Sequence, residues 1–137
     1  MRVMVLVKAS PESETGAMPD EKILAEMGRF NQELVKAGVM LAGEGLHPSS
    51  KGARVRFQGT KRTLVDGPFA ESKELVAGFW LWQVKTLDEA IAWLKRAPFQ
   101  EGEVEIRPVW ELADLPGSPE SKKQYEELRA RIEAQAR

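Results

Sequence analysis

The stretch LVAGFWLWQV at residues 75–84 decides the fold that this sequence predicts. It is a nearly uninterrupted apolar run, which is typical of a buried β-strand. Side chains alternate between the two faces of a strand, so Phe79 and Leu81 share one face while Trp80 and Trp82 share the other. Both faces are therefore apolar, although the helices of one chain can cover only one of them. We expect the face with the two tryptophans to pack against a second copy of the chain.

An alternative reading needs no second copy. A hairpin and a C-terminal helix of the same chain would then cover the second face of the sheet. The segment RVMVLVK at residues 2–8 also has two apolar faces, with valines on one face and Met4 and Leu6 on the other. Because both strands have two apolar faces, we favour a homodimer in which the sheets of two copies pack against each other.

The segments around this strand complete a repeated strand-helix-strand pattern. The expected elements are strands at residues 2–8, 39–46, 75–84 and 103–110, helices at 19–37 and 86–97, and a hairpin at 53–58 and 62–66. The order β-α-β-hairpin-β-α-β predicts an α+β, ferredoxin-like split βαβ fold. Because such crossovers are right-handed, the sheet should be antiparallel with both helices on one face.

The C-terminal segment is expected to be a separate piece. Leu115, Pro116 and Gly117 interrupt the chain, so we expect one domain over residues 1–114 and an accessory helix within 115–137. Its apolar residues form only a narrow stripe amid charges, which predicts a helix that lies on the surface.

Composition argues against several classes of function. The formal net charge is -1, so no general positive field exists to hold nucleic acid or an anionic membrane. The chain has no cysteine and one histidine, and it lacks a Walker loop and a dinucleotide fingerprint. We therefore expect neither a metal nor a cofactor. The absence of a signal-peptide pattern and of a membrane-length apolar stretch predicts a cytoplasmic protein.

The densest group of reactive side chains is DGPFAESKE at residues 66–74. Asp66 and Glu71 would offer carboxylates at the mouth of an apolar sheet, where burial can raise a pKa and permit general acid–base catalysis. The alternative is purely structural, because Asp-Gly-Pro is typical turn chemistry and the charges would then be solvated.

His47 is the single histidine, and it precedes the hairpin. Both ends of a hairpin return to one neighbourhood, so His47 and Asp66 could meet as a proton-transfer pair. A lone histidine in a loop is more often exposed or structural, and that alternative stays open. The hairpin also gathers five cations, which either protect an edge strand or let Arg54 and Arg56 steer an acidic small molecule.

Three segments together resemble the YCII-related family, in its DGPF subgroup: GLHPSSKGARVRF, TLVDGPFAESKELVAGFW and VEIRPV. The resemblance implies a bacterial protein with a dimeric α+β barrel fold. Some relatives carry a His–Asp pair whose histidine lies early in the first helix, and one relative is a dehydrochlorinase acting on a chlorinated aromatic ring. Residues 19–36 contain no histidine here, so that pair is absent.

The resemblance also directs attention to residues that would bind a substrate. These are Arg54, Phe69, Lys73, Trp80 and Arg107. Arg107 would be placed to pair with Asp66 or Glu71.

Two functions follow as expectations. The first is a cofactor-free lyase or isomerase that transfers a proton on a small acidic or aromatic substrate. The second is a non-catalytic module that binds a small ligand or regulates a partner. An enzyme requires Asp66 or His47 within a pocket, whereas a module leaves both groups exposed.

Overall fold

A computed structural model describes residues 1–70 and 74–136 of the chain. Its elements are β1 (Arg2–Lys8), α1 (Pro11–Glu14), α2 (Glu21–Lys36), β2 (Met40–Gly45), η1 (Ser49–Lys51), β3 (Ala53–Gln58), β4 (Lys61–Asp66), β5 (Val76–Gln83), α3 (Leu87–Leu94), β6 (Val104–Pro108), η3 (Leu112–Asp114) and α4 (Pro119–Gln135). The predicted order of strands, helices and inserted hairpin is confirmed.

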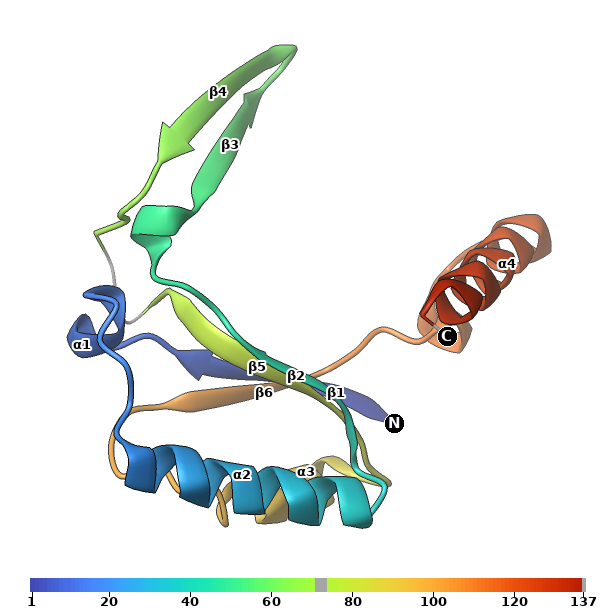
Figure 1. The fold of residues 1–137 in the computed structure, drawn as a ribbon. Coiled ribbons are helices and arrows are strands. Elements are labelled where there is room, and N and C mark those ends of the chain that lie inside the picture. Colours follow the sequence, from blue (N-terminus) through green and yellow to red (C-terminus); the bar gives the residue numbers. More distant parts are fainter. Residues whose placement is uncertain (71–73, 137) are drawn as a thin grey trace.

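The main sheet has four antiparallel strands in the order β2-β5-β1-β6, which is the ferredoxin-like arrangement. Helices α2 and α3 both lie on the same side of this sheet (Figure 1). Strand β6 is an edge strand, which is where Pro108 can be accommodated without losing a ladder hydrogen bond.

Local sequence chemistry explains where the helices begin and end. The side chain of Asp20 accepts a hydrogen bond from the backbone N–H of Ile23 at 2.9 Å and so caps α2. After α2, Gly38 adopts a φ of +74°, a conformation that favours glycine. Thr86 caps α3 by accepting from the N–H of Glu89 at 3.1 Å, as the sequence predicts.

The core lies between the sheet and the two helices. Trp82 is fully buried and Trp80 is 5% exposed, and each indole makes an edge contact with Phe30 of α2. The other core residues are Val3, Val5, Leu34, Val39, Val84 and Ala90.

The expectation that the two tryptophans face a second copy of the chain is wrong. Strand register pairs Trp80 with Val5, and both belong to the face that the helices cover. The helix-free face instead carries Met4, opposite Leu81, and Leu6, opposite Phe79. Because both faces are apolar, the sequence fixes the alternation of side chains but not which face receives the helices.

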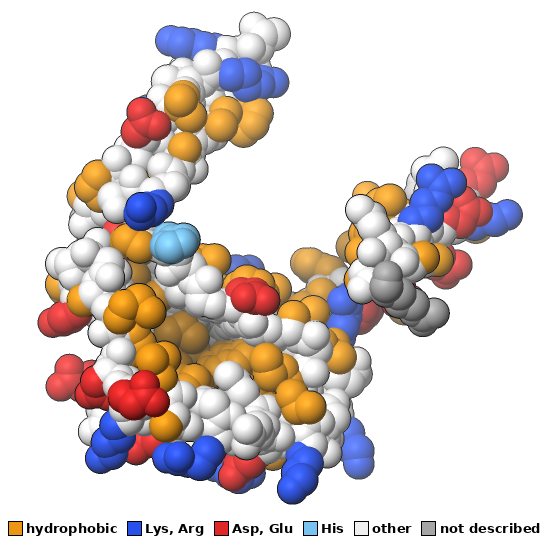
Figure 2. Space-filling view, in the orientation of Figure 1, with side chains coloured by type: hydrophobic (Ala, Val, Ile, Leu, Met, Phe, Trp, Pro, Cys, Tyr) orange, Lys and Arg blue, Asp and Glu red, His pale blue; other side chains and the backbone are white. Residues whose placement is uncertain are grey.

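Two elements leave the body of the fold on its helix-free side. The β3–β4 hairpin rises from one end of the sheet, and α4 lies at the other end (Figure 1). The arrangement is open between them (Figure 2). Within residues 1–70 and 74–136, none of the helices is both apolar enough and long enough to traverse a bilayer.

Candidate functional site

The Asp-Gly-Pro-Phe turn connects the base of the hairpin to the body of the protein. The N–H of Gly67 donates to the carbonyl oxygen of Gly52 at 3.3 Å, and the N–H of Phe69 donates to the hydroxyl oxygen of Ser49 at 3.0 Å. A Cβ atom on Gly67 would lie 1.7 Å from the carbonyl oxygen of Ser49. Only glycine therefore allows this close approach of two backbone segments.

The same serine joins the turn to α1. The carboxylate of Glu14 accepts from the N–H of Ser49 at 2.9 Å and also from its hydroxyl. These two hydrogen bonds favour the charged form and hold the pKa of Glu14 below its ordinary value. Arg54 stacks on the ring of Phe69, with its guanidinium carbon 3.7 Å from the ring centroid. We call the set Glu14, Ser49, Gly67 and Phe69 the hairpin anchor.

Acid should weaken the hairpin anchor. The pKa of Glu14 is lower in the folded chain, so its stabilising contribution is present above about pH 4.3, the unfolded value, and is lost as pH falls through the folded pKa. We expect Glu14→Gln to lower the melting temperature at pH 7, with the difference from wild type shrinking below about pH 4. Thermal unfolding at both pH values measures this. An equal difference at the two pH values would contradict the role of the carboxylate.

Several side chains that the sequence grouped are not paired within the described part of the chain. His47 and Asp66 are both exposed, and in the described part of the chain no hydrogen bond or ion pair joins their side chains. Exposed Arg107 has its Nε 3.8 Å from Glu105 Oε2. The expected roles of Glu71 and Lys73 fall on residues outside those that the structure describes. The paired action of His47 and Asp66 therefore stays a prediction.

A large cavity lies elsewhere, beside Trp80. Its volume is about 1180 Å³. It is bordered by the N-terminal half of α2, by α1 and the segment after it, and by neighbouring ends of the sheet strands. Figure 2 shows this hollow between α2 and the sheet, with hydrophobic side chains on its floor. Its apolar walls include Met18, Ile23, Leu24, Met27, Trp80 and Phe99.

Three glycines make room for this cavity. Gly43 pairs with Trp80, and Gly45 pairs with Gly78, so all three glycines share the face that carries the tryptophans. A Cβ atom on Gly43 would lie 2.7 Å from Cδ1 of Trp80, whereas a Cβ atom on Gly45 would meet no atom within 4 Å. The missing side chains leave space for the indole and for the hollow next to it.

One wall of the cavity carries a fixed polar pair. The indole Nε1–H of Trp80 donates to Oδ1 of Asn31 at 2.9 Å. Because an indole can only donate, the carboxamide turns its oxygen to Trp80 and its NH₂ group becomes the donor that this wall can offer. The pair fixes the orientation of the indole. A specific aromatic site needs such a fixed aromatic wall together with a few placed polar groups.

The charged residues around the cavity are mostly acidic. Among the residues that the structure describes, Lys8 is the one cation in the lining, and its Nζ lies 3.5 Å from Glu105 Oε1. The acidic residues in the lining are Glu12, Glu44, Glu74, Glu101 and Glu103. Among the described residues, no group of three or more His, Asp or Glu side chains is placed to hold a metal ion. The described charges around the cavity are therefore mainly negative.

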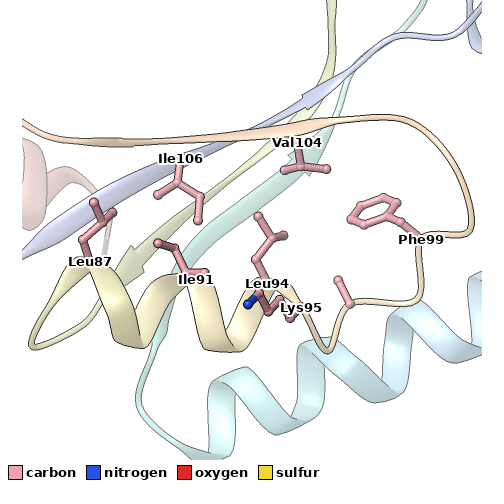
Figure 3. Close-up of a pocket in the computed structure, with 8 residues that line it drawn as sticks. Leu87, Ile91, Leu94, Lys95, Phe99, Val104 and Ile106 are labelled. Atoms are coloured by element: carbon pink, nitrogen blue, oxygen red, sulfur yellow. The ribbon is translucent and has the colours of Figure 1, made fainter.

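A second, smaller cavity of about 520 Å³ lies between α3 and β6. Leu87, Ile91 and Leu94 point from the helix toward Val104 and Ile106 of the strand (Figure 3). Of the described residues in its lining, Lys95 alone has a polar side chain. A cleft with so few polar groups offers little to orient a ligand, so the cavity beside Trp80 is the better candidate site.

The family model for the YCII-related domain matches residues 1–113. The chain belongs to the YCII-related family. The family match ends before α4 begins. Within the family, the chain is similar to an uncharacterised protein of Rhizobium meliloti (strain 1021), with 32% identity over 93 residues that cover 66% of this chain and 75% of that protein.

The chain is also similar to one solved structure of known activity. This is 5-chloro-2-hydroxyhydroquinone dehydrochlorinase (TftG) from Burkholderia phenoliruptrix AC1100, in complex with 2,5-dihydroxybenzoquinone. The identity is 16% and the TM-score is 0.46, over 81% of this chain and 94% of that one.

Sequence reasoning found Trp80 but missed the rest of its cavity. Asn31 and Lys8 lie in segments that the sequence predicts only as a helix and a strand of the core. A usable signal existed in Gly43, Gly45 and Gly78, because glycine inside an apolar strand often marks a close approach or a missing side chain. To locate the cavity from these glycines, one must also know which residues pair across the strands, and the sequence does not give this register.

Proposed function

We propose that this YCII-related protein binds a small aromatic compound, neutral or cationic, in the cavity beside Trp80. The observation that carries the proposal is the cavity itself, with aromatic walls, a fixed Trp80–Asn31 pair and an acidic border. Flat apolar walls with a few placed polar groups are typical of small-molecule sites. Carboxylates next to aromatic faces favour a cation over an anion.

Binding is better supported than proton transfer. A catalytic base must come within hydrogen-bond reach of the proton that it removes. Neither His47 nor Asp66 is among the described residues that line the cavity, so neither group supports a lyase or isomerase reaction there. Arg54 and Arg56 belong to the hairpin and are not in that described lining, so neither of them would attract an acidic substrate into the cavity.

We further infer that the protein belongs to the DGPF subgroup and acts as a homodimer. The subgroup assignment is supported by the role of Gly67 and Phe69 in the hairpin anchor. The homodimer is supported by the helix-free face of the sheet, where Met4, Leu6, Phe79 and Leu81 form an apolar strip. An apolar strip of this kind on one side of a sheet favours packing against a second sheet.

Filling the cavity should weaken binding strongly without disturbing the fold. Gly45→Leu places a side chain where a Cβ atom meets no neighbour, so the chain should fold normally while the leucine occupies the hollow. Gly28→Leu is the matched control, because Gly28 is also without neighbours within 4 Å but is exposed on α2, outside the cavity lining. Calorimetric titration with phenol, benzylamine and benzoate tests ligand charge at nearly constant shape.

The expected result has two parts. Wild type and Gly28→Leu bind phenol and benzylamine more tightly than benzoate, and Gly45→Leu loses affinity by about tenfold or more, equivalent to ~1.4 kcal/mol. Preferential binding of benzoate, or equal binding by Gly45→Leu and wild type, would overturn the proposal.

A further inference from the structure

The β3–β4 hairpin presents an apolar face to solvent. Val55 pairs with Leu64 across the two strands, and Phe57 lies two residues beyond Val55 on the same face. All three side chains are more than half exposed. A two-stranded hairpin is only marginally stable alone, so an apolar face of this size on an isolated hairpin calls for a covering surface.

Helix α4 presents a second apolar face. Tyr125, Leu128 and Ile132 follow at spacings of three and four residues, so they form one stripe along the helix. Each of them is more than half exposed. An ion pair joins α4 to the preceding segment, with Arg129 Nη1 3.7 Å from Glu111 Oε2. The stripe itself is left largely uncovered by the rest of the chain.

The two faces cannot meet within one chain. The hairpin and α4 stand on the helix-free side of the sheet but at opposite ends of it (Figure 1). Their hydrophobic side chains border the same open space above the sheet (Figure 2). The floor of that space is the helix-free face with Phe79 and Leu81. Three uncovered apolar surfaces of one chain thus surround a single volume.

We propose that the occupant of this volume is a second copy of the chain, with the hairpin of each copy packed on α4 of the other. The inference rests on the proposed homodimer and adds its orientation. A two-fold axis that lies between the sheets and runs across the strands exchanges the two ends of the sheet. It therefore brings the hairpin of one copy to the end where its partner carries α4.

Charge is compatible with this pairing. The hairpin segment 51–65 contains five cations and no carboxylate. Two hairpins would therefore repel each other if they met. Helix α4 instead carries four glutamates and four Lys or Arg residues, so its side-chain charges balance. A hairpin that packs on this helix avoids the repulsion between two cationic hairpins, which favours the hairpin–helix contact over a hairpin–hairpin contact.

Disulfide trapping tests the contact directly, because the natural chain contains no cysteine. Two differently tagged full-length copies are coexpressed, one with Phe57→Cys and one with Leu128→Cys, and are then oxidised. A second pair, Leu64→Cys with Tyr125→Cys, samples a neighbouring position, since a disulfide needs Cα atoms about 4.4–6.8 Å apart. The control pair is Phe57→Cys with Lys36→Cys, which places the second thiol at the exposed end of α2 on the other side of the sheet.

We expect a cross-linked heterodimer from at least one hairpin–α4 pair and only background from the control pair. A particle of twice the chain mass that forms no hairpin–α4 cross-link in either pair would overturn the inference while leaving the homodimer intact. A monomer would overturn both the inference and the homodimer. Neither outcome depends on aromatic ligands, so the cavity proposal is tested separately.

Discussion

Leu81→Glu should give a folded monomer, whereas Trp82→Glu should not fold. The two residues are neighbours on β5, but their side chains point to opposite faces of the sheet. Leu81 is half-buried on the helix-free face, where a charge would be solvated in a monomer and buried in a dimer. Trp82 is fully buried under the helices. Losing it removes ~3–5 kcal/mol of packing, and the new carboxylate is buried without a partner.

The size of the destabilisation decides whether each variant folds. Domains of this kind are stable by only ~5–15 kcal/mol, so the combined cost at Trp82 approaches the whole of that stability. For Leu81→Glu we expect a weakening of dimerisation of about tenfold or more, with a cooperative thermal transition retained. Light scattering and circular dichroism measure the two effects, and Gln32→Glu, at an exposed position of α2 on the other side of the sheet, is the control. A folded Trp82→Glu monomer would show that the tryptophan face is the interface after all.

Gly67→Ala should be the most damaging conservative change in the hairpin anchor. The added Cβ atom would lie 1.7 Å from the carbonyl oxygen of Ser49, a backbone atom that cannot rotate away. The base of the hairpin must therefore shift, and the hydrogen bond from Phe69 to Ser49 should be lost with it. Overpacking of this kind costs about 1–3 kcal/mol.

Gly52→Ala is the matched control for that change. Its Cβ atom would lie 3.6 Å from the same carbonyl oxygen, an ordinary contact. We expect Gly67→Ala to lower the melting temperature and to speed tryptic cleavage in the hairpin, at Arg54 or Arg56, while Gly52→Ala stays near wild type. Equal behaviour of the two variants would mean that the tight approach at Gly67 does not hold the hairpin in place.

Local features of the fold could be predicted because they depend on residues close in sequence. Thr86 and Glu89 predict the start of α3, Gly38 predicts the end of α2, and each is found where expected. The hairpin is equally local, because strict alternation over residues 53–58 and the turn after it determine its pairing.

Features that depend on which segments meet could not be predicted in the same way. Both faces of β5 are apolar, so nothing in residues 75–84 chooses the face that packs on α2. The choice becomes clear only when Gly43 is seen opposite Trp80, where the absence of a side chain admits the indole. The density of charged residues in DGPFAESKE drew attention to Asp66, whereas the described lining of the cavity takes Glu74 from that segment and its other residues from positions spread between Val7 and Val104. The space left by small residues such as Gly43 and Gly45 is thus a second guide to a candidate site, and it depends on strand pairing.

The indole N–H signals of the protein test the cavity proposal most directly. The chain has four tryptophans, and Trp80 is the one that lines the cavity. In a proton–nitrogen correlation spectrum, titration with benzylamine should move the Trp80 signal first and furthest, with Trp93 and Trp110 as internal references. The Asn31→Ala variant assigns the Trp80 signal, because it removes the acceptor of that N–H. A Trp80 signal that stays fixed while a reference signal moves would place the aromatic ligand elsewhere and contradict the proposed function.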